Sequence, residues 1–164
     1  MSATVTIAVL NYQRRDALRE ALQSARAQRA AIEILAVDNA STDGSAEMVR
    51  AEFPDVRLVR LPENVAAAAR NAGVAAAKGD IVVTIDNDVR LLTPDAVERT
   101  VAAFARHPRA AIVNFAIVGP DGGLSRRDWC HPRDPAVWGA REFLTDYVLE
   151  GASACRRAAF LEAG

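Results

Sequence analysis

The chain has 164 residues, of which 51% are hydrophobic and 25% are charged, and its formal net charge at pH 7 is −1. This length fits a single domain with a buried core, and the composition excludes an intrinsically disordered chain. Because acidic and basic residues nearly balance, the sequence gives no electrostatic footprint for nucleic-acid binding.

The sequence carries no pattern of a targeting or membrane-spanning segment. Residues 1–4 lead straight into a strand-like run, without the charged and apolar regions of a signal peptide. No apolar stretch reaches the roughly 18 residues that span a membrane. The two cysteines, Cys130 and Cys155, are far apart and form no CxxC pair, which favours a reducing compartment. We therefore expect a cytoplasmic protein.

Strands and helices alternate through the first two thirds of the chain. The apolar, β-branched run at 4–10 predicts a buried strand, and leucines at helical spacing in RRDALREALQSARAQ predict a helix after it. Residues 32–37 predict a second strand, followed by a helix that Asp43 can cap. The alternating pattern of residues 56–61 predicts a third strand, at the edge of the sheet.

A helix of very small residues comes next. Asn64 is placed to cap it, in the segment VAAAARNAGVAAAK, and DIVVTI predicts a fourth strand. Thr93, Pro94 and Asp95 predict the start of another helix, with the proline at its first position. Residues 110–118 predict a fifth strand.

The pattern changes after Val118. GPDGG suits a hairpin turn, and the polar, proline-containing segment that follows predicts a long loop. DYVLEGASACRR predicts a strand that contains Gly151, and RRAAFLEAG begins a last helix. This order predicts a three-layer α/β/α domain with a mainly parallel, mixed sheet, covering residues 1–164 as one domain.

Polar residues follow three of the predicted strands. In open parallel sheets, ligands bind beyond the carboxyl ends of the strands, where the strand order reverses. Three clusters fall at that edge and predict a binding site: Leu10, Asn11 and Tyr12; Asp38 and Asn39; Asp86, Asn87 and Asp88.

The residue types at this edge suit a nucleoside diphosphate. An aromatic ring beside a carboxylate, Tyr12 with Asp38, fits a planar base whose ring N–H needs an acceptor. The neighbouring carboxylates of Asp86 and Asp88 repel each other, which favours a divalent cation such as Mg²⁺ or Mn²⁺ shared with phosphate oxygens. Arg70, on the alanine-rich helix, can contact phosphate.

Other interpretations of these motifs stay open. The DND segment can be a solvated turn, and Arg70 a solvent-facing helix residue. Cys130 and His131 have no second pair at ligand spacing, so we expect loop residues and no metal site there. A dinucleotide-dependent oxidoreductase is disfavoured because no GxGxxG follows the first strand, and a nucleotidyltransferase would need a glycine-rich, basic loop there.

Four segments of the chain resemble the family 2 glycosyltransferases, inverting enzymes of the GT-A fold that use nucleotide-diphospho-sugars. The matching segments are TIAVLNYQRRDAL, LAVDNASTDGSAEMV, ENVAAAARNAGVAAAKGDIVVTIDNDV and DYVLEGASACRRAAFLEAG. The resemblance covers most of the chain outside residues 119–145. The motifs DNASTDGS, ARNAG and DND are specific as a set in this order and spacing.

The resemblance implies a role for each matching residue. Leu10 and Tyr12 would lie against the nucleobase, and Asp88 would ligate the metal directly. Residues 1–118 would form the nucleotide-sugar-binding part and residues 119–164 the start of the acceptor-side part. The implied donor-binding residues are Leu10, Asn11, Tyr12, Arg14, Asp38, Asn39, Arg70, Asn71, Asp86 and Asn87; the implied metal ligands are Asp88 and Asp86; and the implied acceptor-side residues are Gly151 and Arg156.

The activity implied is metal-dependent transfer of a sugar, with UDP-sugar as the favoured donor, to a saccharide, lipid-linked or small-molecule acceptor. The family's catalytic carboxylate follows a segment like FLEAG, so we expect the base beyond Gly164 and a chain that is either truncated or lacks the base. The alternative is a non-catalytic nucleotide-sugar-binding domain. Peripheral membrane association and self-association through an uncovered apolar face are further expectations. Ala66 stands where the family usually has glycine.

Overall fold

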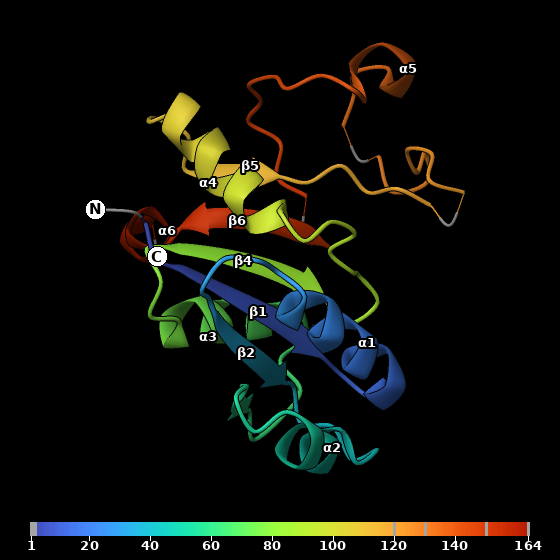
Figure 1. The fold of residues 1–164 in the computed structure, drawn as a ribbon, viewed down its shortest axis with the longest axis vertical. Helices are drawn as coiled ribbons and strands as arrows, with labels where there is room; N and C mark the ends of the chain where they lie inside the picture. The colour runs from blue at the N-terminus through green and yellow to red at the C-terminus, as the bar shows by residue number, and fades with distance from the viewer. Residues whose placement is uncertain (1–2, 120, 130, 150, 164) are drawn as a thin grey trace.

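A computed structural model describes residues 3–119, 121–129, 131–149 and 151–163 of the chain. Within these residues the strands form one six-stranded sheet of order β3-β2-β1-β4-β6-β5 (Figure 1). Cys130 and Gly164 lie outside the described residues, so the expectations for them are not tested by the structure. The strands are β1 (Val5–Asn11), β2 (Glu33–Asp38), β3 (Arg57–Arg60), β4 (Ile81–Asp86), β5 (Ile112–Asn114) and β6 (Ala152–Arg156).

The sheet is mainly parallel, with two antiparallel pairs at one side. β1 pairs in parallel with β2 and β4, and β2 pairs in parallel with β3. β6 runs antiparallel to both β4 and β5. The predicted mainly parallel, mixed sheet is confirmed, and β3 lies at an edge as its alternating pattern indicated.

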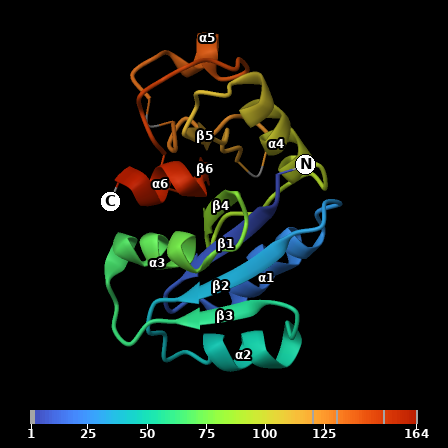
Figure 2. The same ribbon diagram turned by 90° about the vertical axis from the view of Figure 1, so that its left-hand side faces the viewer.

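Helices cover both faces of the sheet. α1, α2 and α4 pack on one face, while α3 and α6 pack on the other and lie to the left in Figure 2. The three-layer α/β/α prediction is therefore confirmed. The helices are α1 (Arg15–Arg26), α2 (Ser45–Glu52), the 3₁₀ helix η1 (Ala66–Ala68), α3 (Ala69–Ala76), α4 (Ala96–Arg106), α5 (Pro135–Trp138) and α6 (Arg157–Ala163).

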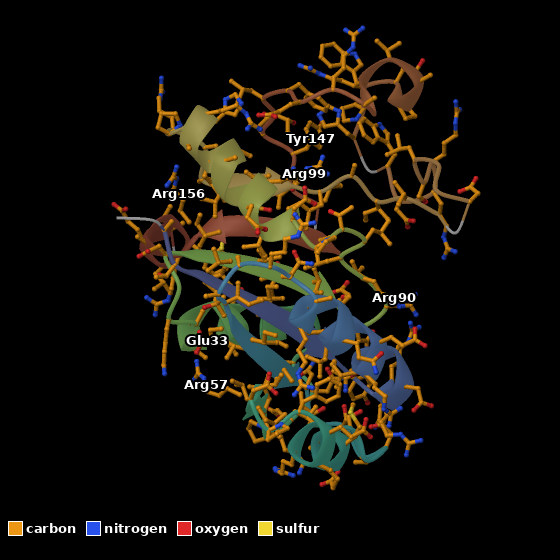
Figure 3. The ribbon with its side chains drawn as sticks, viewed as in Figure 1. Glu33, Arg57, Arg90, Arg99, Tyr147 and Arg156 are labelled. Carbon is orange, nitrogen blue, oxygen red and sulfur yellow. The ribbon has the colours of Figure 1, made fainter. Side chains whose placement is uncertain are left out.

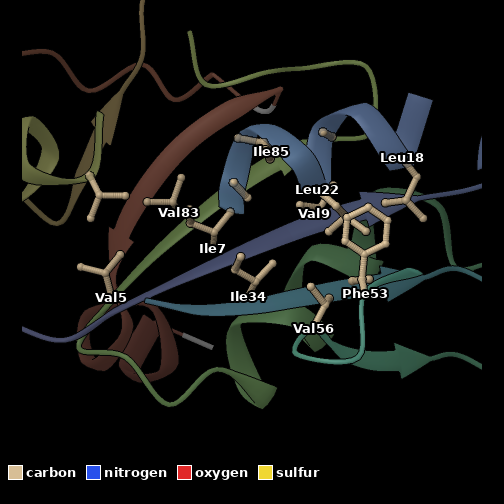
Figure 4. Packing of buried hydrophobic residues seen from close by; sticks show 14 of the residues in the cluster. Val5, Ile7, Val9, Leu18, Leu22, Ile34, Phe53, Val56, Val83 and Ile85 are labelled. Carbon is tan, nitrogen blue, oxygen red and sulfur yellow. The ribbon is translucent and has the colours of Figure 1, made fainter. Parts of the chain in front are cut away.

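β1 is apolar along its length because it is buried from both sides. Val5, Ile7 and Val9 contribute to the cluster under α1, shown in Figure 4, and Ala8 contributes to the cluster under α3. A strand covered on both faces needs a continuous apolar run instead of an alternating one. This explains why β1 is recognisable in the sequence.

The small residues of α3 allow this helix to lie close to the sheet. A Cβ at Gly73 would lie 3.1 Å from Cγ2 of Val37 on β2 and 3.4 Å from Cβ of Ala8 on β1. Ala69 and Val74 are fully buried on the same side of the helix. A larger residue at position 73 would push α3 away from the strand ends that it borders.

Four predicted boundaries differ from the structure. α4 begins at Ala96, because Thr93 O accepts a hydrogen bond from Ala96 N in a turn before the helix. β5 covers only Ile112–Asn114, the residues that pair with β6, and α3 is preceded by the 3₁₀ turn η1. Gly151 lies just before β6, where its carbonyl accepts a hydrogen bond from Asp86 N.

The segment between β5 and β6 is mostly irregular and extends past α4 and β5 in Figure 1. Its predicted hairpin turn is confirmed by the bridge between Val118 and Leu124. Glu142 ties the segment to α4 by accepting hydrogen bonds from Arg106. None of the helices in the described part of the chain is long and apolar enough to cross a membrane.

Asp43 links the starts of two helices. Its carboxylate accepts hydrogen bonds from Arg15 N, at 2.8 Å, and from Ser45 N, at 3.0 Å, the first residues of α1 and α2. Burial alone would raise the pKa of the Asp43 carboxyl, but hydrogen bonds from the Ser45 hydroxyl and from these backbone N–H groups lower the pKa below its ordinary value. The N-cap position of α2 itself is taken by Gly44, at φ 84°.

Asp43→Asn is expected to reduce the loss of stability in acid. A folded-state pKa below the unfolded value of about 3.9 stabilises the fold above that pH, and the contribution is lost as the pH falls through the folded-state pKa. Urea midpoints measured from neutral pH down to about pH 2.5 should therefore fall less in Asp43→Asn than in the wild type. If the urea midpoints of the two proteins fell in parallel as the pH is lowered, a lowered pKa of Asp43 in the folded state would be contradicted.

Candidate functional site

The three predicted polar clusters meet at one edge of the sheet. Asn11, the last residue of β1, is paired in register with Asp38, the last residue of β2. On the other side of β1, Leu10 is paired with Asp86, the last residue of β4. Because β2 and β4 flank β1, the strand order reverses here, which is where open parallel sheets bind ligands.

Buried amides connect these clusters below the surface. Asn87 Nδ2 donates to Asn11 Oδ1 at 2.8 Å, and Asn11 Nδ2 donates to Ser41 Oγ at 3.2 Å and to Asp38 Oδ1 at 3.4 Å. Asn11, Ser41 and Asn87 are all buried. These side chains therefore hold the loops after β1, β2 and β4 together and turn away from the surface.

Asn39 has the same structural role on the other side of β2. Its Nδ2 donates to Asn64 Oδ1 at 2.8 Å and to Ala66 O at 3.2 Å, and its Oδ1 accepts from Val65 N at 3.0 Å. This buried amide fixes the loop that leads into η1 and α3. The amides of Asn11, Asn39 and Asn87 thus all bond within the protein, and their role in donor binding stays a prediction.

Asp38 carries an acceptor oxygen that the described residues leave without a hydrogen bond. The residue is 0% exposed, and its Oδ2 has no hydrogen-bond partner among them. Arg60 Nε lies 3.5 Å from Oδ2, an ion-pair distance that is too long for a good hydrogen bond. Buried acceptors in this situation are costly, and a ligand N–H would satisfy this one.

A hollow is lined by the arginine that pairs with this acceptor, and an exposed tyrosine follows the neighbouring strand β1. Arg60 lines an open hollow of about 480 Å³, together with residues of the loops after β2 and β3. The side chain of Tyr12, which follows β1 directly, is exposed. Arg60 and Ser41 were not singled out by sequence reasoning, although Arg60 is paired in register with Asp38 and so falls at the same edge.

The two carboxylates at the end of β4 and in the turn after it each lie against an arginine. Arg70 Nη2 donates to Asp86 Oδ1 at 3.0 Å, and Arg14 Nη1 donates to Asp88 Oδ2 at 2.7 Å. Arg70 also donates to Thr84 Oγ1 at 3.2 Å, which fixes its guanidinium over β4. The structure thus brings Arg14 and Arg70 to Asp88 and Asp86 from distant parts of the sequence.

Strained backbone accompanies the site. Gln13, Ala40 and Ala66 have positive φ angles of 54°, 62° and 51°, and they follow β1, β2 and β3 respectively. The left-handed conformation costs a non-glycine residue about 1 kcal/mol or more. Strain of this kind concentrates at functional sites. The conformation of Ala66 also explains why a glycine suits that position.

Some of the remaining predicted residues lie near the strand ends that form the site, and one lies far from them. Gly151 lies against Asp86, since a Cβ there would be 3.8 Å from Asp86 Oδ2, and Asn71 is exposed on α3. Arg156 is at the opposite edge of the sheet, paired with Ile81 and donating to Phe104 O and Ala110 O. Figure 3 shows it at the far end from Arg90, which follows the Asp86–Asp88 turn. The structure therefore does not bring Arg156 to the site.

Comparison with known proteins settles the family. The model of the family described as Glycosyl transferase family 2 matches residues 6–163. The chain belongs to glycosyl transferase family 2. It is 35% identical over 122 residues to the Succinoglycan biosynthesis protein ExoO of Rhizobium meliloti (strain 1021), covering 72% of this chain and 35% of that protein.

A second relative is longer still. The chain is 31% identical over 123 residues to the Chondroitin synthase of Pasteurella multocida (strain Pm70), covering 72% of this chain and 12% of that protein. The chain thus spans about a third or less of the length of the curated relatives that it matches.

Solved structures confirm the predicted GT-A fold. The mannosyltransferase PcManGT from Pyrobaculum calidifontis, in complex with GDP-Man and Mn²⁺, matches with a TM-score of 0.78 at 24% identity, over 100% of this chain and 47% of that one. S. aureus TarS in complex with UDP-GlcNAc matches with a TM-score of 0.72 at 18% identity, over 98% of this chain and 47% of that one.

The residues of this family 2 member fit a divalent cation that is shared with a ligand. Asp86 and Asp88 offer hard carboxylate oxygens, which Mn²⁺ and Mg²⁺ prefer. The part of the chain that the structure describes holds no group of three or more His, Cys, Asp or Glu residues suited to a metal. Two carboxylates leave further positions for oxygens of a ligand and of water, as is usual for Mg²⁺.

Proposed function

We propose that this chain binds a nucleotide-diphospho-sugar, with UDP-sugar as the favoured donor, together with Mn²⁺ or Mg²⁺, for transfer of the sugar to an acceptor hydroxyl with inversion. The observation that carries the proposal is the arrangement at the edge of β1. A buried oxygen of Asp38 that no described residue hydrogen-bonds lies on one side of the strand, and the carboxylate turn at the end of β4 lies on the other. The similarity to proteins solved with GDP-Man and UDP-GlcNAc supports a nucleotide-sugar ligand.

The base would be recognised beside β2. The Oδ2 atom of Asp38 would accept a hydrogen bond from a ring N–H of the base, and the exposed ring of Tyr12 would lie against the base plane. The backbone of Leu10, which precedes Asn11 and Tyr12, would border the same space. Asp38 is held in place for this by the buried Asn11 amide.

The diphosphate would lie toward β4. Asp88 would be the direct metal ligand, and Asp86 would bind the ribose or the metal shell. Arg70 and Arg14 would contact phosphate oxygens, with Asn71 near the ribose. The ion, when bound, supplies positive charge that stabilises the departing diphosphate.

The reaction is a single displacement. The acceptor oxygen forms a bond to the anomeric carbon as the bond from that carbon to the diphosphate breaks, and the hydroxyl proton passes to a base. The resemblance implies that this base is a carboxylate beyond Gly164. Residues 1–118 would bind the donor, and residues 119–164, including Gly151 beside Asp86, would begin the acceptor side.

We place the protein in the cytoplasm, because its two cysteines are widely separated.

Calorimetric titration of UDP tests the donor site without needing an acceptor. Binding is expected with Mn²⁺, and EDTA should weaken it by about 100-fold or more, because the ion joins the carboxylates to the diphosphate. GDP and dTDP titrations run in parallel show which base is preferred. A folded sample that binds none of the three nucleotides with Mn²⁺ would refute the proposal.

A further inference from the structure

Arg14 and Asp88 form an ion pair between the loop after β1 and the turn after β4. The distance from Arg14 Nη1 to Asp88 Oδ2 is 2.7 Å, and the side chains are 58% and 57% exposed. The two residues are 74 positions apart in the sequence. Both side chains lie largely in solvent, so the pair can open without disturbing the core.

The neighbouring pair of Arg70 and Asp86 is more buried. The Arg70 side chain is only 15% exposed, and its guanidinium also donates to Thr84 Oγ1. This second contact holds Arg70 over β4 whatever happens at Asp86. Of the two arginines at the site, Arg14 is the one that is free to exchange its partner.

Arg14 and a divalent cation compete for the same carboxylate. Arg14 Nη1, 2.7 Å from Asp88 Oδ2, already donates a hydrogen bond to an oxygen that a cation would ligate. If both were held there, a double and a single positive charge would repel each other at short range. Ion binding at Asp88 is therefore weakened while Arg14 stays there, and an anion that accepts the Arg14 guanidinium removes this repulsion.

We propose that Arg14 couples ion binding to nucleotide binding by exchanging Asp88 for the diphosphate. Without nucleotide, Arg14 holds Asp88 and weakens cation binding. When a diphosphate is present, Arg14 moves to its oxygens, and Asp88 becomes available to the cation. This inference rests on the proposed function and adds to it a reason for the two ligands to bind together. By linkage, each ligand raises the affinity for the other by the same factor.

The test is Mn²⁺ binding measured by electron paramagnetic resonance, with and without UDP, in the wild type, Arg14→Gln and Arg15→Gln. Arg15→Gln is the matched control. It removes the same charge at the next position in the chain, and the Arg15 side chain contacts Asp16, not Asp88. Without UDP, Arg14→Gln should bind Mn²⁺ about two- to fivefold more tightly than the wild type, the usual effect of an exposed ion pair. Arg15→Gln should resemble the wild type.

With UDP, the factor by which the nucleotide tightens Mn²⁺ binding should be smaller in Arg14→Gln than in the wild type. Without UDP, an Mn²⁺ affinity that is unchanged in Arg14→Gln, or that rises as much in Arg15→Gln as in Arg14→Gln, would overturn the exchange while leaving the donor site intact. A folded wild type that binds neither Mn²⁺ nor UDP would instead overturn the proposed function, and the exchange with it.

Discussion

Replacement of Asp88 by alanine is expected to weaken Mn²⁺-dependent UDP binding by about 100-fold, the order of a lost charged ligand. In the proposed site, Asp88 is the direct protein ligand of the ion, and the ion connects the protein to the diphosphate. In EDTA, Asp88→Ala should bind UDP no more weakly than the wild type does, because the ion no longer contributes in either protein. The measurement is calorimetric titration of UDP under both conditions.

The Asp88→Ala protein should remain folded. The Asp88 side chain is exposed and its ion pair with Arg14 is a surface pair, so the loss in unfolding free energy should be at most about 1 kcal/mol. Asp16→Ala is a matched control, since it removes an exposed carboxylate that pairs with Arg19 on α1. Wild-type affinity for UDP in folded Asp88→Ala with Mn²⁺ would exclude Asp88 as a ligand.

The second large effect concerns stability. Leu22→Ala is expected to lower the free energy of unfolding by about 2–5 kcal/mol, because it removes three carbon atoms from a packed core and leaves a cavity. Leu22 is 0% exposed on the face of α1 that packs on β1, and Figure 4 shows it among Leu18, Val9 and Phe53. Since α1 follows Arg14 directly, its packing also positions one side of the site.

Leu92→Ala is the matched control for this core substitution. Leu92 is 71% exposed, so the same change of side chain should alter the free energy of unfolding by no more than about 0.5 kcal/mol. The measurement is urea unfolding of both variants. If the free energy of unfolding depends on urea concentration with the same slope in both, their midpoints compare their stabilities directly. Similar midpoints for the two variants would contradict the burial of Leu22 against the sheet.

The strand ends and the residues that follow them were predictable from local pattern. A strand covered on both faces must be apolar throughout, so the strands β1, β2 and β4 were visible as short runs and their ends as the positions where Asn11, Asp38 and Asp86 begin the polar clusters. The meeting of these clusters then followed from a general property of parallel sheets. The position of Arg156 did not follow, because the antiparallel direction of β6 depends on pairing with β4, which no local pattern encodes.

By itself, the sequence determined the α/β/α layers, the parallel core of the sheet and the edge at which polar residues gather, since all three depend on short-range periodicity. Only the tertiary structure decided how those polar residues act. It turned Asn11 and Asn87 inward to bond each other, left Asp38 Oδ2 without a hydrogen-bond partner among the described residues, and set Arg14 against Asp88. The physical reason is that side-chain direction and pairing at a sheet edge are set by contacts between segments far apart in the chain.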